Sequence, residues 1–121
     1  MRGLPAFAAM LAAAASAQAA DVEAGKAVFN RCKICHSLSA KAPPMTGPSL
    51  HGLFGRKAGA YDDFPYSPAM KSSGIVWDDA TLAKFLRDPK AFIPNNNMAF
   101  PGITDDAKLA DLLAYLKQAT Q

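Results

Sequence analysis

The stretch Arg31-Cys32-Lys33-Ile34-Cys35-His36 holds both cysteines of the chain and one of its two histidines. In a helical turn, thiols three positions apart lie on the same face, and a side chain four positions after the first thiol projects from nearly the same side. Two thiols can therefore reach two substituents on one edge of a flat molecule. The imidazole of His36 would then lie beneath that molecule, where it could bind a metal.

Cys-x-x-Cys-His is the attachment signal for c-type haem, whose two vinyl groups form thioether bonds with the thiols. The motif predicts that Cys32 and Cys35 attach one haem c and that His36 can bind its iron. Zinc would need four ligands. Beyond the two cysteines only His36 and His51 remain, and His36 is adjacent to Cys35, which is awkward for a closed tetrahedral site. A thioredoxin-like dithiol needs a βαβ setting that the sequence lacks, and a structural disulfide would leave His36 unexplained.

The beginning of the chain, MRGLPAFAAMLAAAASAQAADVEAGK, predicts export. It combines a basic residue, an apolar run and the small-x-small pattern Ala17-Gln18-Ala19, which are typical of a secretory signal. Polar residues and a proline interrupt the run, which argues against an uncleaved membrane anchor. We therefore expect residues 1–19 to be a cleaved signal peptide and residues 20–121 to form a soluble domain in the bacterial periplasm.

The composition suits one small globular domain, because the chain has 121 residues, of which 50% are hydrophobic. Removal of Arg2 with the signal lowers the formal net charge of +3 by one. Nucleic-acid-binding proteins usually carry a much denser basic face, so we expect no nucleic-acid partner. We also expect no membrane span in the mature chain, and a monomer.

Caps and apolar periodicity predict short helices rather than strands. Helices are expected to begin at the capping residues Asp21, Ser67, Asp78 and Thr104. The first leads into the cysteine motif, and the third should end before Pro89. Residues 37–65 contain many prolines and glycines and no helical periodicity, so we expect a long loop there. Such a loop, with few large apolar side chains, indicates that a large apolar cofactor replaces part of the core.

An iron atom bound by one histidine has a further axial position, and its occupant separates electron transfer from ligand binding. Met98 is the best candidate, because the asparagines and prolines around it keep it outside any helix. Packing in the core is the alternative role for Met98. Met70 falls within a predicted helix and is assigned to core packing. Met45 follows the cysteine motif too closely, and His51 is interpreted as a surface or loop-packing residue.

The whole predicted mature chain resembles the class I cytochromes c, close to the mitochondrial type and its bacterial periplasmic relatives. The matching segments follow the family order nearly without gaps: GKAVFNRCKICH, TGPSLHGLFGRKAG, SSGIVWDDATLAKFLRDPKAFIP, NMAFPGI and LADLLAYLKQAT. The resemblance implies a small all-α fold, with short helices and long loops wrapped around one covalently bound haem. It also implies that the N- and C-terminal helices cross, where Gly25 and Phe29 would meet Leu112 and Tyr115.

The resemblance assigns roles to residues around the haem. His36 and Met98 are its two axial ligands, and the carbonyl of Pro48 accepts the free ring N–H of His36, which fixes the tautomer. Three further residues surround or hydrogen-bond the two haem propionates, whose buried charges need partners. These three are Arg56, Tyr66 and Trp77.

A single-haem electron carrier is the function that the resemblance implies, with one electron passing at a time through the exposed haem edge. The protein would not be an enzyme. Its partners would be membrane electron-transfer complexes and soluble oxidoreductases. They would dock on a basic patch formed by Arg31, Lys33, Lys41 and Lys90. If Met98 is not an iron ligand, the alternative is a gas-binding or weakly peroxidatic c-type haem protein.

Some positions depart from the family pattern. Phe85 stands where many members have a tyrosine, and Met70 stands where an asparagine is usual, so we expect a reduced polar network beside the distal ligand. Other positions are often lysine in the mitochondrial type but not here: Ala91, Asn97, Asp105 and Asp106. We therefore expect docking to be weaker or directed elsewhere.

Overall fold

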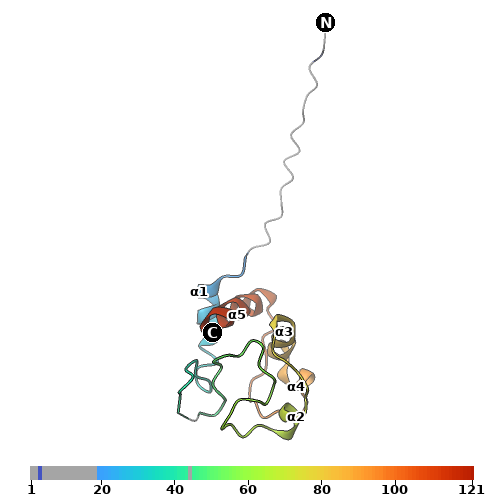
Figure 1. Cartoon of the computed structure of the whole chain (residues 1–121). Helices are drawn as coiled ribbons and strands as arrows, with labels where there is room; N and C mark the ends of the chain where they lie inside the picture. Colours follow the sequence, from blue (N-terminus) through green and yellow to red (C-terminus); the bar gives the residue numbers. More distant parts are fainter. Residues whose placement is uncertain (1–2, 4–18, 44) are drawn as a thin grey trace.

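The computed structural model describes residues 3, 19–43 and 45–121, so the predicted signal peptide lies almost entirely outside the described residues. The helices of this part are α1 (Val22–Phe29), α2 (Pro68–Lys71), α3 (Asp79–Arg87), α4 (Pro89–Phe92) and α5 (Asp106–Ala119) (Figure 1). The described chain contains no strand, only an isolated bridge between Lys57 and Val76. The predicted all-α class is confirmed. None of these helices is long and apolar enough to cross a membrane.

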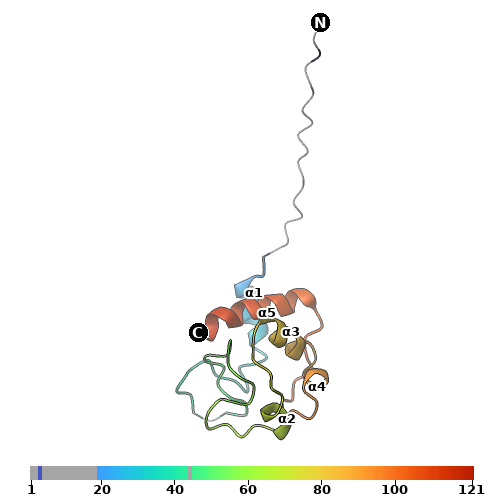
Figure 2. The same ribbon diagram turned by 45° about the vertical axis from the view of Figure 1, so that its right-hand side comes forward.

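The first and last helices cross at one end of the molecule, as predicted (Figures 1 and 2). A Cβ atom at Gly25 would lie 1.9 Å from the carbonyl oxygen of Asp111 and 2.8 Å from the Cβ of Tyr115. Only glycine permits such close contact between two helix backbones. The rings of Phe29 and Tyr115 lie beside the crossing with their centroids 5.4 Å apart, and Leu112 is fully buried.

The start of α5 differs from the prediction by one residue. Asp105, not Thr104, is the N-cap, because its carboxylate accepts a hydrogen bond from the backbone N–H of Lys108 at 3.0 Å. Thr104 lies outside the helix, and its carbonyl accepts from the Arg87 guanidinium at 3.2 Å. Thr104 and Asp105 can both cap a helix, so the sequence alone does not show which of them does so.

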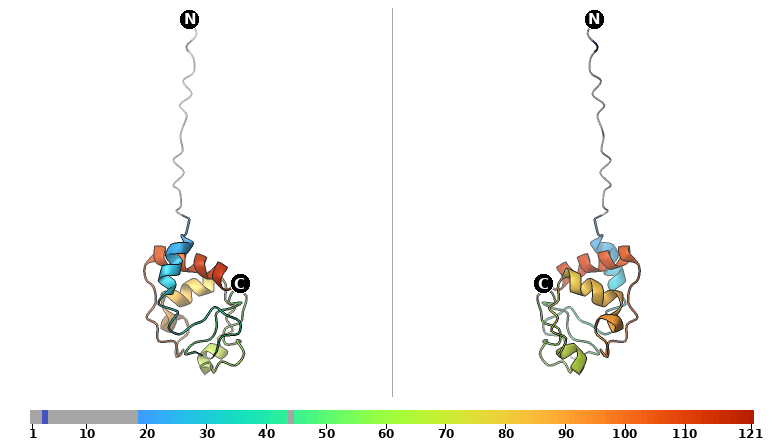
Figure 3. Two further views of the ribbon diagram at one scale, coloured as in Figure 1. Left: turned by 90° about the vertical axis from the view of Figure 1, so that its left-hand side faces the viewer. Right: turned by 90° about the vertical axis from the view of Figure 1, so that its right-hand side faces the viewer.

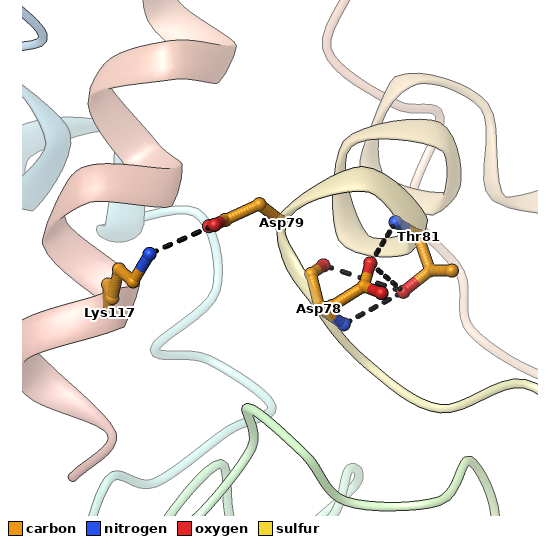
Figure 4. Close-up of polar contacts among 4 residues, drawn as sticks. All are labelled: Asp78, Asp79, Thr81 and Lys117. Atoms are coloured by element: carbon orange, nitrogen blue, oxygen red, sulfur yellow. Dashed lines mark hydrogen bonds and ion pairs between the residues drawn. The ribbon is translucent and has the colours of Figure 1, made fainter.

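The predicted cap of α3 is confirmed. The carboxylate of Asp78 accepts from the Thr81 N–H at 2.8 Å, and the Thr81 hydroxyl accepts from the Asp78 N–H at 2.9 Å (Figure 4). Lys117 on α5 reaches Asp79 at 2.9 Å and so links α5 to the start of α3.

The short helix α4 was not predicted. Pro89 indeed ends α3, but it also occupies the first turn of α4, where its missing N–H costs nothing. The carboxylate of Asp88 caps this second helix by accepting from the Ala91 N–H at 3.2 Å. One proline therefore stops one helix and starts the next.

The described part of residues 37–65 is a long loop, as predicted, and it runs from the end of the cysteine motif below α1 and the C-terminal end of α5 (Figures 1 and 3). Most buried apolar side chains belong to helices, whereas this loop contributes only Leu53 and Ala58 to the core. The loop is therefore arranged around something other than its own side chains.

Candidate functional site

The cysteine motif continues directly from the end of α1, as predicted. Backbone hydrogen bonds keep the chain in a helical turn: Cys32 N–H to Phe29 O at 2.8 Å, and His36 N–H to Cys32 O at 2.9 Å. Cys32 and Cys35 are both half-buried free thiols. Burial raises the pKa of the Cys32 thiol, with a smaller opposing effect from the charge of Arg31.

The imidazole of His36 is held by a turn that lies 12 residues later in the chain. Its Nδ1 lies 2.7 Å from the carbonyl oxygen of Pro48, so the contact predicted between these residues is present. A carbonyl can only accept, so Nδ1 carries the hydrogen and Nε2 keeps the lone pair that a metal needs. Burial lowers the pKa of His36, which favours this neutral ring. A Cβ at Gly47 would lie 2.5 Å from Cε1, so a larger residue there would displace the ring.

A cavity of about 910 Å³ opens beside the cysteine motif. Its walls include Cys32, Cys35, His36 and Met98. Pro48, Arg56, Tyr66 and Trp77 line it as well. The structure thus brings together every residue predicted to hold the haem or its iron. The volume lies at the upper end of the range for cofactor sites.

Apolar side chains from the helices form much of the remaining wall. Leu82, Phe85 and Leu86 come from α3, and Leu116 comes from α5. All four are buried, and the ring of Phe85 lies 5.0 Å from that of Trp77 between centroids. The cavity is therefore a site of low polarity, which suits the macrocycle of a haem.

Arg56 provides a positive charge in the cavity wall. Its Nη1 donates to the carbonyls of Ser49 at 3.0 Å and His51 at 3.1 Å, and its guanidinium lies 4.9 Å from the ring centre of Tyr61. Burial lowers the pKa of Arg56, but a guanidinium remains charged at neutral pH. Tyr66 accepts from the Tyr61 N–H at 3.2 Å, and burial raises the pKa of Tyr66. This group of residues suits carboxylates such as haem propionates.

Tyr61 is a site residue that sequence reasoning missed. It lines the cavity and packs under Arg56. Tyr61 lies in a proline- and glycine-rich loop, where no periodicity indicates which side chains point inward, so the sequence does not predict that it faces the cavity.

Three methionines line the cavity, namely Met45, Met70 and Met98, whereas His51 is exposed and does not. Met70 packs against the core, as predicted, but it also forms part of the cavity wall. Met98 is half-buried on a segment outside any helix, as predicted. Within the described residues, no three His, Cys, Asp or Glu side chains gather in a way that could hold a metal ion. The donors in the cavity are instead an imidazole, thioethers and two thiols, which fit a covalently attached haem.

Arg31, Lys33 and Lys41 of the predicted basic patch are exposed near the cavity, and Arg31 and Lys41 line its wall. Lys90 differs, because its ammonium contacts the backbone carbonyl of Asn96. Ile34, between the two cysteines, is 79% exposed. The surface near the attachment turn is therefore basic with an apolar side chain in it.

Comparison with known proteins agrees with this site. The family model for cytochrome c matches residues 22–120. Cytochrome c-550 of Nitrobacter winogradskyi is 49% identical over 81% of this chain and 90% of its own. Cytochrome c2 of Blastochloris viridis is 45% identical over 90% of this chain and 86% of its own. The solved structure of cytochrome cH from Methylobacterium extorquens is 43% identical, with a TM-score of 0.76 over 81% of this chain and 98% of its own. The chain therefore belongs to the cytochrome c family, and it is an electron carrier with one covalently bound haem c.

Proposed function

We propose that this protein carries one electron at a time between redox partners, with His36 and Met98 as axial ligands and Cys32 and Cys35 as thioether anchors. The observation that carries the proposal is the convergence of these four side chains on one largely apolar cavity. When bound, haem c supplies an iron atom that gains and loses one electron. The protein's own residues position it, exclude water and dock its partners.

His36 offers Nε2 to the metal because Pro48 engages Nδ1. This hydrogen bond fixes the ring orientation and increases the basicity of the ligating nitrogen. Because the backbone of the cysteine motif and the carbonyl of Pro48 both fix the ring, the ligand is held from two sides. Little movement of the ring should accompany a change of oxidation state.

Met98 offers a soft thioether, which favours ferrous iron over ferric iron. The buried walls from α3 and α5 disfavour the additional positive charge of the ferric state. Both effects raise the reduction potential. If His36 and Met98 both bind the iron, they would leave it no open position for a substrate, and for this reason we propose that the protein is not an enzyme.

The polar side of the cavity would hold the propionates. Arg56 supplies the positive charge, and Tyr66 and Trp77 supply an O–H and an N–H donor at the same cavity. Tyr61 joins them as a stacking partner of Arg56. Pairing with a guanidinium offsets the cost of burying carboxylates.

We further propose that residues 1–19 are a signal peptide cleaved on export, that residues 20–121 form the mature domain, and that it functions in a bacterial periplasm. Partners would be membrane complexes and oxidoreductases that dock on Arg31, Lys33 and Lys41. Lys90 is a weaker candidate for docking, because its ammonium is already engaged by Asn96.

Replacement of the proposed distal ligand tests the function. In wild-type protein, the ferric state should show the far-red sulfur-to-iron charge-transfer band, and the ferrous state should bind carbon monoxide poorly. Met98→Ala should abolish the band, lower the reduction potential and raise the apparent affinity for carbon monoxide by at least roughly a hundredfold, because no side chain competes any longer. A wild type without the band that binds carbon monoxide readily would instead favour a gas-binding protein.

Charge reversal tests the docking surface. Lys33→Glu should slow electron exchange with a physiological partner by about tenfold at low ionic strength, because steering depends on the local potential. Lys108→Glu, an exposed residue on α5 that does not line the cavity, changes the net charge equally and is the control. Equal rates for the two variants would place the contact surface elsewhere.

A further inference from the structure

Met98 lies on a segment that no helix or strand supports. This segment runs from the end of α4 at Phe92 to the start of α5 at Asp106. Ordering the backbone of such a segment costs conformational entropy, so a ligand on an unsupported segment would be released easily. Something else must define the position of Met98.

Asn96, two residues earlier, is only 3% exposed, whereas its neighbours Asn95 and Asn97 are both exposed. Its Nδ2 donates to the carbonyl of Pro89 at 2.9 Å and to that of Ile93 at 2.8 Å. These carbonyls belong to the one-turn helix α4 and its C-cap, and the end of a helix needs such external donors. The side chain of Asn96 therefore fastens the segment to α4.

The other atom of the same amide reaches Met98. Oδ1 of Asn96 accepts a hydrogen bond from the backbone N–H of Met98 at 2.9 Å. The ammonium of Lys90, also on α4, contacts the backbone carbonyl of Asn96 and lies 3.4 Å from Oδ1. Asn95 has a φ of 66°, a left-handed conformation that turns the chain between α4 and Asn96. Every polar atom of the Asn96 side chain is thus used.

We propose that Asn96 is the positioning residue for the axial ligand, and that Lys90 supports it by holding its carbonyl. The inference rests on the proposed ligation of iron by Met98. A thioether is a neutral ligand that competes with water and added ligands for the iron. The fraction of molecules in which it stays bound therefore depends on how much conformational entropy the Met98 segment still loses on binding. The hydrogen bonds of Asn96 order part of this segment before Met98 binds, and so reduce that entropy loss.

Imidazole competition measures this effect directly. Added imidazole binds ferric iron only in molecules whose Met98 has dissociated, so its apparent affinity rises with that dissociated fraction. Asn96→Leu removes the amide hydrogen bonds to Pro89, Ile93 and Met98 at similar volume and should increase the apparent affinity for imidazole at least roughly tenfold. Asn96→Asp keeps an acceptor for Met98 but loses both donors to α4, and should give a smaller increase. Lys90→Met should increase the affinity about twofold to fivefold.

The control is Thr120→Val. Thr120 is buried at the C-terminus of α5, and its hydroxyl donates to the Leu116 carbonyl at 2.7 Å. This variant should lower the urea midpoint measured by far-ultraviolet circular dichroism but leave the imidazole affinity and the far-red band unchanged. A second control combines Asn96→Leu with Met98→Ala. It should bind imidazole as Met98→Ala does, because positioning has no effect once the ligand is absent.

The outcomes separate the inference from the proposed function. If Asn96→Leu lowers the urea midpoint but keeps wild-type imidazole affinity, Asn96 is merely structural and the inference is overturned. If Asn96→Leu does not fold, unchanged affinity in both Asn96→Asp and Lys90→Met overturns it instead. If the wild type itself lacks the far-red band and binds imidazole as tightly as Met98→Ala, the ligation by Met98 fails and the inference fails with it.

Discussion

The α1–α5 crossing and the loop of residues 37–65 are built in different ways. At the α1–α5 crossing, protein packs directly on protein: Phe29 is 1% exposed, Leu112 is 0% exposed, and Gly25 lies against the opposite backbone. The described residues of the 37–65 loop place only Leu53 and Ala58 in the buried core, and many of the others line the cavity. The crossing can be stabilised by the chain alone, whereas the loop needs the cofactor to complete its packing.

The largest expected effect comes from removing the cofactor anchor. With Cys32→Ala and Cys35→Ala combined, no thioether can form, and backbone amides of residues 45–66 should lose hydrogen-exchange protection by at least about a hundredfold. Amides of α1 and α5 should lose less, because Gly25, Phe29, Leu112 and Tyr115 at the crossing do not line the cavity. In wild-type protein, colour should stay with the polypeptide in acidified acetone. Equal losses of hydrogen-exchange protection in residues 45–66 and in α1 and α5 would show that the loop does not depend on the cofactor more than the crossing does.

The crossing itself is tested at Gly25. Gly25→Ala would place a methyl group 1.9 Å from the Asp111 carbonyl oxygen, so the helices must separate. Overpacking of this kind should lower the free energy of unfolding by about 3 kcal/mol, measured by urea titration of the haem-containing protein. The exposed neighbour Lys26 is the control, because Lys26→Ala should change that free energy by less than about 0.5 kcal/mol. A tolerated alanine would show that the crossing is looser than described.

The smallest effect concerns the start of α3. Hydrogen bonds from Thr81 lower the pKa of Asp78, so the folded state favours its ionised form. This stabilisation is present above the unfolded pKa near 4 and is lost as pH falls through the lower folded pKa. Asp78→Ala should therefore lower the urea midpoint at pH 7, and the difference from wild type should narrow at pH 3. A difference that stays constant with pH would show that charge contributes nothing to this cap.

The cysteine motif and most of the helix caps could be predicted from the sequence, because they depend on residues close together in the chain. The spacing of Cys32, Cys35 and His36 is a property of one turn of chain, and the caps of α1, α2 and α3 follow from residues adjacent to each helix. The N-cap of α5 was wrong by one residue, because adjacent residues with equal capping ability compete. The helix α4 was missed, because Pro89 gives the same signal for an end and for a beginning.

What could not be predicted depends on distant contacts. Three consecutive asparagines look alike in sequence, yet only Asn96 is buried and hydrogen-bonded to α4. The contact of Lys90 could not be predicted either, because its partner is the backbone carbonyl of Asn96, and every residue type has such a carbonyl. Tyr61 enters the cavity through the path of a loop without periodicity.

The α1–α5 crossing also sets an order of events during synthesis. It pairs the first helix of the described chain with the last, so α1 lacks this partner until α5 has been made. Contacts of such large sequence separation must also overcome a large loop-closure entropy before they form. Until α5 is made, the thiols of Cys32 and Cys35 follow a helix that has not yet packed. A chain that is still being made or exported therefore presents both thiols before its first and last helices can pair.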